Sequence, residues 1–138
     1  MKRYMSLDIG DRTVGIAVSD LLGLTAQGVE TIRRKNIEDD LNRITELIKQ
    51  YEVDDIVSGL PKNMDGTEGE RCQIVKDFVA EIKKQHPTIN IHFWDERLST
   101  VAATRSLIAA DVSRKKRKKV IDKMAAVFIL QGYLDSVR

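Results

Sequence analysis

Apolar residues in the first third of the chain alternate with polar or small residues, as they do in β-strands. The segments 3–9, 14–19 and 27–32 fit this pattern. The first two are joined by Gly10-Asp11-Arg12-Thr13, a short sequence typical of a hairpin turn. We therefore expect an antiparallel meander of three strands at the start of the chain.

From residue 37 the apolar positions recur every three or four residues instead of every two. Ile37, Leu41, Ile44 and Tyr51 follow this spacing, with charged residues between them. This pattern predicts an amphipathic helix over residues 37–51.

Two short strands alternate with further helices in the rest of the chain. Residues 55–60 and 89–94 are short apolar runs, typical of buried parallel strands. Helical spacing predicts one helix around 74–82 and a second from about 100 to 110. A last helix is expected to begin within or just after a basic block at 114–119.

This order of elements predicts a single α/β domain over residues 1–138. Three antiparallel strands are followed by two parallel strands, and helices cover both faces of the mixed sheet. The length of 138 residues and the 42% hydrophobic and 32% charged content fit one soluble globular domain.

Composition also bears on location. No run approaches the ~20 apolar residues of a membrane span, and an acidic residue at position 8 interrupts the N-terminus before a signal-peptide core could form. Cys72 is the only cysteine, which indicates a reducing compartment. We expect a cytoplasmic protein.

The net charge of +2 conceals an uneven distribution. Residues 1–100 carry a net charge of −4 and residues 101–138 a net charge of +6. Six consecutive basic residues form what we call the basic block: Arg114, Lys115, Lys116, Arg117, Lys118 and Lys119. Such a block is usually solvated and attracts polyanions, so we expect it to bind a nucleic-acid backbone.

Acidic residues occur at the ends of two predicted strands and on the last helix. Asp8 ends the first strand, and Asp95-Glu96 end the last strand. Ligands of α/β sheets commonly bind at such strand ends. Each acid also has a structural interpretation: Asp8 could simply begin a turn, and Asp95 and Glu96 could form surface ion pairs.

Asp122 is the most informative of these acids. Its neighbours at helical spacing are Ala125, Ala126 and Ile129, so its carboxylate would lie on the apolar side of the helix. A carboxylate there needs a cation, a metal ion or hydrogen bonds. A buried ion pair with Arg97 or Arg105 is the structural alternative.

The three acids would converge if the strand ends are neighbours and the last helix packs over them. Oxygen ligands of this kind suit Mg²⁺ or Mn²⁺. Two such ions about 4 Å apart can promote phosphodiester hydrolysis. A zinc site is not expected, because Cys72, His86 and His92 are isolated and badly spaced.

Four motifs in order make the chain resemble the YqgF/RuvX family over nearly its whole length. They are Asp8-Ile9-Gly10; Gly59-Leu60-Pro61 followed by Asp65-Gly66-Thr67; Asp95-Glu96-Arg97-Leu98-Ser99-Thr100; and Asp122-Lys123-Met124-Ala125-Ala126 followed by Ile129-Leu130. Members of this family are described as Holliday-junction resolvases or as nucleases that mature the 5′ end of pre-16S ribosomal RNA.

The resemblance implies a ribonuclease-H-like fold and catalytic, metal-binding acids at Asp8, Glu96 and Asp122. A site with two Mg²⁺ or Mn²⁺ ions is expected, with Arg97 and the basic block contacting nucleic acid. The related resolvase RuvC has an acid at the end of the strand that here ends Ser58-Gly59-Leu60. An acid of the next strand must substitute, and the choice between Asp95 and Glu96 stays open.

The function expected from the sequence is that of a metal-dependent nuclease in 5′-end maturation of pre-16S ribosomal RNA. The alternatives are a Holliday junction resolvase acting on branched DNA and a non-catalytic nucleic-acid-binding ribosome-assembly factor. An actin-like or sugar-kinase-like phosphotransferase is disfavoured, because 138 residues supply only one of the two lobes it needs. Expected partners are structured RNA or branched DNA, and pre-ribosomal particles, with no membrane.

Three features leave their roles open. The polar loop 62–69 could order a phosphate, act as a lid or be a plain surface loop, and Arg71 is a phosphate contact only if its helix points toward the site. Both a monomer and a homodimer are compatible with the chain. Leu21, Leu22 and Leu24 could form a dimer patch or pack under the sheet.

Overall fold

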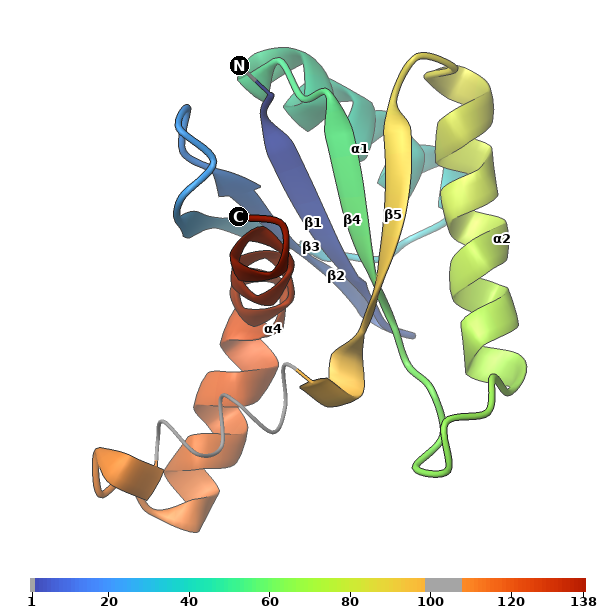
Figure 1. Ribbon diagram of the computed structural model, residues 1–138. Coiled ribbons are helices and arrows are strands. Elements are labelled where there is room, and N and C mark those ends of the chain that lie inside the picture. The colour runs from blue at the N-terminus through green and yellow to red at the C-terminus, as the bar shows by residue number, and fades with distance from the viewer. Residues whose placement is uncertain (1, 99–107) are drawn as a thin grey trace.

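The computed structural model describes residues 2–98 and 108–138, apart from the side chains of residues 118–123. A five-stranded mixed sheet with the strand order β3-β2-β1-β4-β5 forms its centre (Figure 1). The strands are β1 (Tyr4–Ile9), β2 (Thr13–Ser19), β3 (Ala26–Arg33), β4 (Asp55–Leu60) and β5 (Asn90–Asp95). All five predicted strands are therefore confirmed to within about one residue at each end.

The sheet has an antiparallel half and a parallel half, as predicted. β2 pairs antiparallel with both β1 and β3, and the register shifts between Ile16 and Ala17. β4 pairs parallel with β1 and with β5. The carboxyl ends of β1, β4 and β5 consequently lie along one edge of the sheet.

Helices α1 (Ile37–Tyr51) and α2 (Glu70–Gln85) cover one face of the sheet, and α4 (Arg114–Ser136) covers the other (Figure 1). The predicted bounds of α1 are confirmed. Its start is fixed by Asn36, whose side chain accepts a 2.9 Å hydrogen bond from the Asp39 amide. Most of the expected helix near 100–110 falls outside the described residues.

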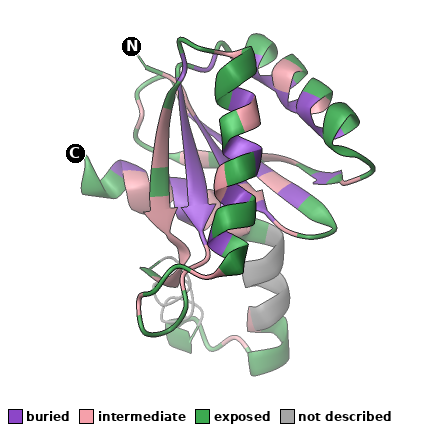
Figure 2. Cartoon of the chain, turned by 90° about the vertical axis from the view of Figure 1, so that its right-hand side faces the viewer, coloured by how far each residue is buried: buried purple, intermediate pink, exposed green. Residues whose placement is uncertain are grey.

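Each face of the sheet has its own layer of buried apolar side chains, and the central strands are coloured mainly as buried in Figure 2. The larger layer joins β1, β2 and β4 to α1 and α2, and includes Met5, Leu7, Ile44, Ile56 and Ile82. The smaller layer joins Ala17 and Val57 to α4 through Ile129, Leu130 and Leu134. Side chains at alternate positions of each central strand are therefore buried on opposite faces.

Helix α4 changes direction at Met124, where φ is −110° and ψ is 15°. After this point it packs on the sheet, and the Ser6 hydroxyl donates a buried 2.6 Å hydrogen bond to the Ala126 carbonyl. Before this point the helix extends away from the sheet (Figure 1). The basic block thus forms the start of α4 and stands clear of the core.

Two further sequence expectations can be compared with the fold. Leu21 and Leu22, at the β2–β3 connection, are 63% and 68% exposed, so the interpretation that they pack under the sheet is wrong. Among the described residues, no helix has the length and apolar character needed to cross a membrane.

Candidate active site at the carboxyl ends of β1 and β5

Asp8 and Glu96 meet at the edge formed by the carboxyl ends of the parallel strands. Asp8 lies near the end of β1, and Glu96 follows the last residue of β5. Their carboxyl groups are hydrogen-bonded to each other. The sequence expectation that acids at these two strand ends lie together is therefore borne out by the geometry.

Both acids face the layer occupied by α4. A Cβ atom built on Gly15, the β2 residue paired with Asp8, would lie 3.6 Å from the Asp8 Cβ and 3.5 Å from the Ala126 Cβ. The first packed turn of α4 therefore comes close to the β2 residue that lies beside Asp8.

Gly59 makes room for Glu96. This glycine is buried near the end of β4, beside Asp8 in the sheet. A Cβ atom at Gly59 would lie 2.8 Å from the Glu96 Cγ and 2.7 Å from the Ile129 Cδ1, and it would overlap the Glu96 Oε1. The acid of the neighbouring strand end therefore occupies the space that a side chain on β4 would need. Sequence analysis missed this role, although a glycine in an otherwise apolar central strand often marks a close approach.

Burial and the neighbouring Asp8 raise the pKa of Glu96 to about 8. Burial is the largest cause, followed by the charge of Asp8, the hydrogen bond to Asp8 and, as the smallest cause, the charge of Asp95. The positive charge of Arg71 acts in the opposite direction. The two carboxyl groups consequently share a proton near neutral pH, with the Glu96 O–H donating to Asp8.

Asp95 has a different partner from Glu96. Its carboxylate accepts hydrogen bonds from the Arg97 backbone amide at 3.0 Å and from the Arg97 Nη2 at 2.7 Å. These bonds hold the pKa of Asp95 below its usual value. The sequence leaves the choice between Asp95 and Glu96 open. In the structure Glu96 is hydrogen-bonded to Asp8, whereas Asp95 is paired with Arg97.

Arg97 also forms a hydrogen bond to the loop 62–69. Its Nη1 donates a 3.1 Å hydrogen bond to the Met64 carbonyl. The loop is closed on itself as well, because the Asn63 amide donates to the Thr67 carbonyl and the Gly66 amide to the Asn63 carbonyl, both at 2.9 Å. The loop is thus a hydrogen-bonded turn attached to the end of β5, and a nucleic-acid contact by Arg97 stays a prediction.

Arg71, in the first turn of α2, lies near the acid pair. It forms an ion pair with Asp11 in the β1–β2 turn, and its charge reaches Glu96. The start of α2 therefore points toward the site, which is the condition that sequence analysis set for Arg71 as a phosphate contact.

The third predicted acid, Asp122, belongs to α4, one turn before Ala126, and its side chain lies outside the described residues. Within the part of the chain whose side chains are described, no three His, Cys, Asp or Glu residues come together as a metal site. The described site thus consists of two carboxyl groups, with Asp122 on the helix that packs against one of them.

The described part of the basic block is solvent-accessible. Arg114, Lys115 and Lys116 are exposed, whereas Arg117 is half-buried and donates a 3.1 Å hydrogen bond to the Val112 carbonyl. The side chains of Lys118 and Lys119 lie outside the described residues. Cations at a helix N-terminus oppose the helix dipole, so the block does not serve to stabilise α4.

Comparison with known families decides the classification. The family model named RuvX, described as Holliday junction resolvase, matches residues 2–136. The chain belongs to the RuvX family. It is 59% identical over 135 residues to a Clostridium botulinum relative named "Putative pre-16S rRNA nuclease", with 98% of each chain covered. A RuvX relative of the same name from Clostridioides difficile is 60% identical over 133 residues, covering 96% of this chain and 94% of that one.

Solved structures show that this RuvX chain has the fold of resolvases of the RuvC type. Thermus thermophilus RuvC superposes with a TM-score of 0.59 at 12% identity, covering 97% of this chain and 95% of that one. The Fowlpox virus Holliday junction resolvase superposes with a TM-score of 0.55, also at 12% identity, with 99% of each chain covered. The predicted ribonuclease-H-like fold and the family assignment are confirmed.

Proposed function

We propose that this RuvX protein is a metal-dependent nuclease that hydrolyses phosphodiester bonds during 5′-end maturation of pre-16S ribosomal RNA. The observation that carries the proposal is the Asp8–Glu96 pair, two half-buried carboxyl groups hydrogen-bonded at a sheet edge. The names of the RuvX relatives support the choice of substrate. A pre-ribosomal substrate would place the protein in the cytoplasm.

The acid pair fits a divalent cation. Two carboxyl groups forced to share a proton would both ionise if a cation were bound between them. Asp8, Glu96 and Asp122 would hold Mg²⁺ or Mn²⁺, and two ions could be accommodated with further ligands from substrate phosphate and water. Such ions supply Lewis acidity, lower the pKa of bound water and neutralise charge on the leaving oxygen.

The chain's own residues would position the substrate around this pair. Gly59 leaves the space in which Glu96 approaches Asp8. Arg71 belongs to α2, which covers the face of the sheet opposite α4. It would neutralise negative charge on an oxygen of the scissile phosphate. The basic block of α4 would hold the backbone at a distance from the cut and increase the salt dependence of binding, without specifying sequence. Arg97 would hold the loop 62–69 in place. The solvent-accessible part of the Arg97 side chain would contact nucleic acid.

Resolution of Holliday junctions is the second candidate function, favoured by the description of the RuvX family model. Two symmetric cuts would require two active sites related by a two-fold axis, and therefore a homodimer. End maturation of one RNA strand can be performed by a monomer. A non-catalytic assembly factor would bind RNA through the basic block and leave it uncut.

Cleavage of two labelled substrates tests these functions against one another. A pre-16S RNA carrying its 5′ leader and a four-way DNA junction are incubated with Mg²⁺, Mn²⁺ or EDTA, beside the Asp8→Asn protein. The proposal predicts metal-dependent cutting of the RNA that Asp8→Asn abolishes. Cutting of the DNA junction alone would favour the resolvase, and salt-sensitive binding without any cutting would contradict the proposed nuclease.

A further inference from the structure

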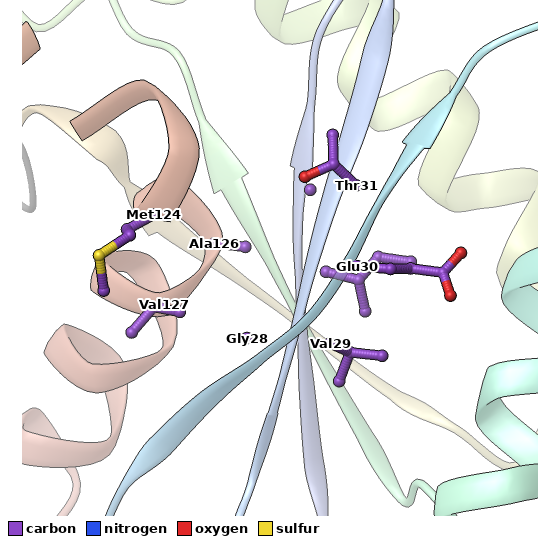
Figure 3. Close-up of a pocket in the computed structure, with 9 residues that line it drawn as sticks. Gly28, Val29, Glu30, Thr31, Met124, Ala126 and Val127 are labelled. Atoms are coloured by element: carbon purple, nitrogen blue, oxygen red, sulfur yellow. The ribbon is translucent and has the colours of Figure 1, made fainter. Parts of the chain in front are cut away.

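A groove of about 370 Å³ lies between β2–β3 and α4 (Figure 3). Its boundaries are mainly glycine backbone and apolar side chains, with one hydroxyl. Its lining residues include Gly15, Gly28, Thr31, Met124, Ala126 and Val127.

One lining residue of the groove, Gly15, is the neighbour of Asp8 in the sheet. Asp8, Gly15 and Thr31 are register partners on β1, β2 and β3, so they form one row across the sheet. A Cβ atom on Gly15 would lie 4.0 Å from the Asp8 Oδ2. Neighbouring strands lie about 4.8 Å apart, which places the Thr31 end of the row roughly 10 Å from Asp8.

The groove floor is open because two glycines replace side chains. Gly15 and Gly28 both lie on the α4 face, and a Cβ atom on Gly28 would reach 3.5 Å from the Val127 Cγ2. The side chains of Val29 and Glu30 point away from α4 (Figure 3). Glu30 is instead paired with Arg43 of α1, so its charge is directed to the other face.

The opposite wall is the first packed turn of α4. Met124, Ala126 and Val127 line it, at the point where the helix changes direction away from the sheet. Met124 is 39% exposed. The groove thus lies next to Asp8 on its β2 side and next to the point where α4 leads toward the basic block on its other side.

We propose that this groove binds the base and sugar of one unpaired nucleotide next to the scissile phosphate. This inference rests on the proposed nuclease function. The apolar wall and glycine floor suit the faces of a base or sugar, and the Thr31 hydroxyl suits a polar edge. The backbone phosphate would remain at the acid end. A groove of this volume has room for one nucleotide, and we expect the cleaved strand to be single-stranded at this position.

Filling the groove tests the inference. Gly28→Leu places a side chain in the groove, and Gln27→Leu is the matched control. Gln27 is the preceding, exposed residue of β3 and is paired with Val18, whose side chain belongs to the opposite layer. If Gly28→Leu does not fold by circular dichroism, Thr31→Phe fills the groove from its exposed end.

Both variants are compared with wild type on a short RNA that wild type cleaves. In one set of substrates a single abasic nucleotide is moved through the positions around the cut. We expect one abasic position to weaken metal-free binding by wild type and Gln27→Leu about tenfold, the loss of one base contact. Gly28→Leu should bind the intact RNA about tenfold more weakly and respond to the abasic position less than about twofold, because the contact is already lost.

The outcomes separate the groove from the proposed function. If wild type cleaves and Gly28→Leu shows the same abasic sensitivity as wild type, the groove does not hold a nucleotide. The same holds if the RNA is cut equally well when the sensitive position is base-paired to a complementary strand. If wild type cleaves no substrate in the presence of metal, the proposed nuclease function fails, and the inference fails with it.

Discussion

Glu96 and Asp95 are adjacent in the sequence, yet only Glu96 contacts Asp8. Alternation of side chains along β5 ends at Asp95, and Glu96 begins the helical turn that follows. Strand periodicity therefore does not predict to which face of the sheet the Glu96 side chain points. The choice between the two acids depends on Gly59, a residue of another strand, and so it could not be made from the sequence near residue 95.

The fit of Glu96 over Gly59 gives a prediction for Gly59→Ala. The added methyl group would displace Glu96 and Ile129, at a cost of about 1–3 kcal/mol in unfolding free energy. Mn²⁺ affinity measured by calorimetry should fall together with stability. Gly28→Ala is the control, since its Cβ meets Val127 at an ordinary 3.5 Å and should leave Mn²⁺ affinity unchanged. Unchanged Mn²⁺ binding by folded Gly59→Ala would show that Gly59 does not position Glu96.

The raised pKa of Glu96 gives a second prediction, for metal-free protein. Glu96 has a pKa of about 8 in the folded state and an ordinary value of 4.5 when unfolded. The folded state therefore binds this proton more tightly, and its contribution to stability is full below pH 4.5 and is lost as pH rises through 8. The free energy of unfolding should fall over this window with a limiting slope of about 1.4 kcal/mol per pH unit.

Urea unfolding in EDTA at a series of pH values measures this slope. Glu96→Gln should flatten it, and Mg²⁺ should restore stability at the alkaline end by binding the folded state. A wild-type curve that is flat between pH 5 and 8 would contradict the shared proton.

At the scale of elements, α4 has two parts with different roles. Its second part packs on the sheet, and its first part carries the basic block away from it. The Ser6–Ala126 hydrogen bond joins the packed part to β1, two residues before Asp8. This bond therefore joins the acid-bearing strand directly to the helix that carries Asp122.

Ser6→Ala should therefore destabilise the fold. Ser6 is fully buried, and loss of its hydrogen bond to the Ala126 carbonyl is expected to cost about 1–2 kcal/mol. Ser136→Ala, which removes an exposed hydroxyl bonded to the Tyr133 carbonyl near the end of the same helix, should change stability by less than about 0.5 kcal/mol. Equal urea midpoints for the two variants would show that the Ser6 bond does not anchor α4.

The sequence predicted the elements well where one periodicity dominates. The bounds of α1 and β4 agree with the predicted 37–51 and 55–60 because each segment has a clear apolar pattern and a defined start or end. α2 begins at Glu70, earlier than its first apolar pair suggests, because Glu70, Arg71 and Gln73 in its first turn are polar. The groove beside Asp8 could not be predicted, since it depends on the register of glycines from β2 and β3.

At the scale of the whole molecule, the charge asymmetry of the sequence corresponds to an arrangement in space. The acid pair lies at one edge of the sheet, and the exposed start of α4 carries the basic block. A nucleic-acid strand could contact the block, the groove and the acid pair in succession. That the 138 residues form one independently folding domain stays a prediction.

The central claim is that Asp8 and Glu96 hold the catalytic cation and that Asp95 does not. Its most direct test is Mn²⁺ binding by calorimetry, paired with cleavage of pre-16S leader RNA, for wild type, Glu96→Gln and Asp95→Asn. We predict that Glu96→Gln lowers the cleavage rate by at least about 100-fold and weakens Mn²⁺ binding to a matching extent. This loss of activity is larger than the loss usually seen when a residue that only hydrogen-bonds to a metal ligand is replaced. Asp95→Asn should retain Mn²⁺ binding. Retention of both properties by Glu96→Gln, or their loss in folded Asp95→Asn alone, would contradict this account.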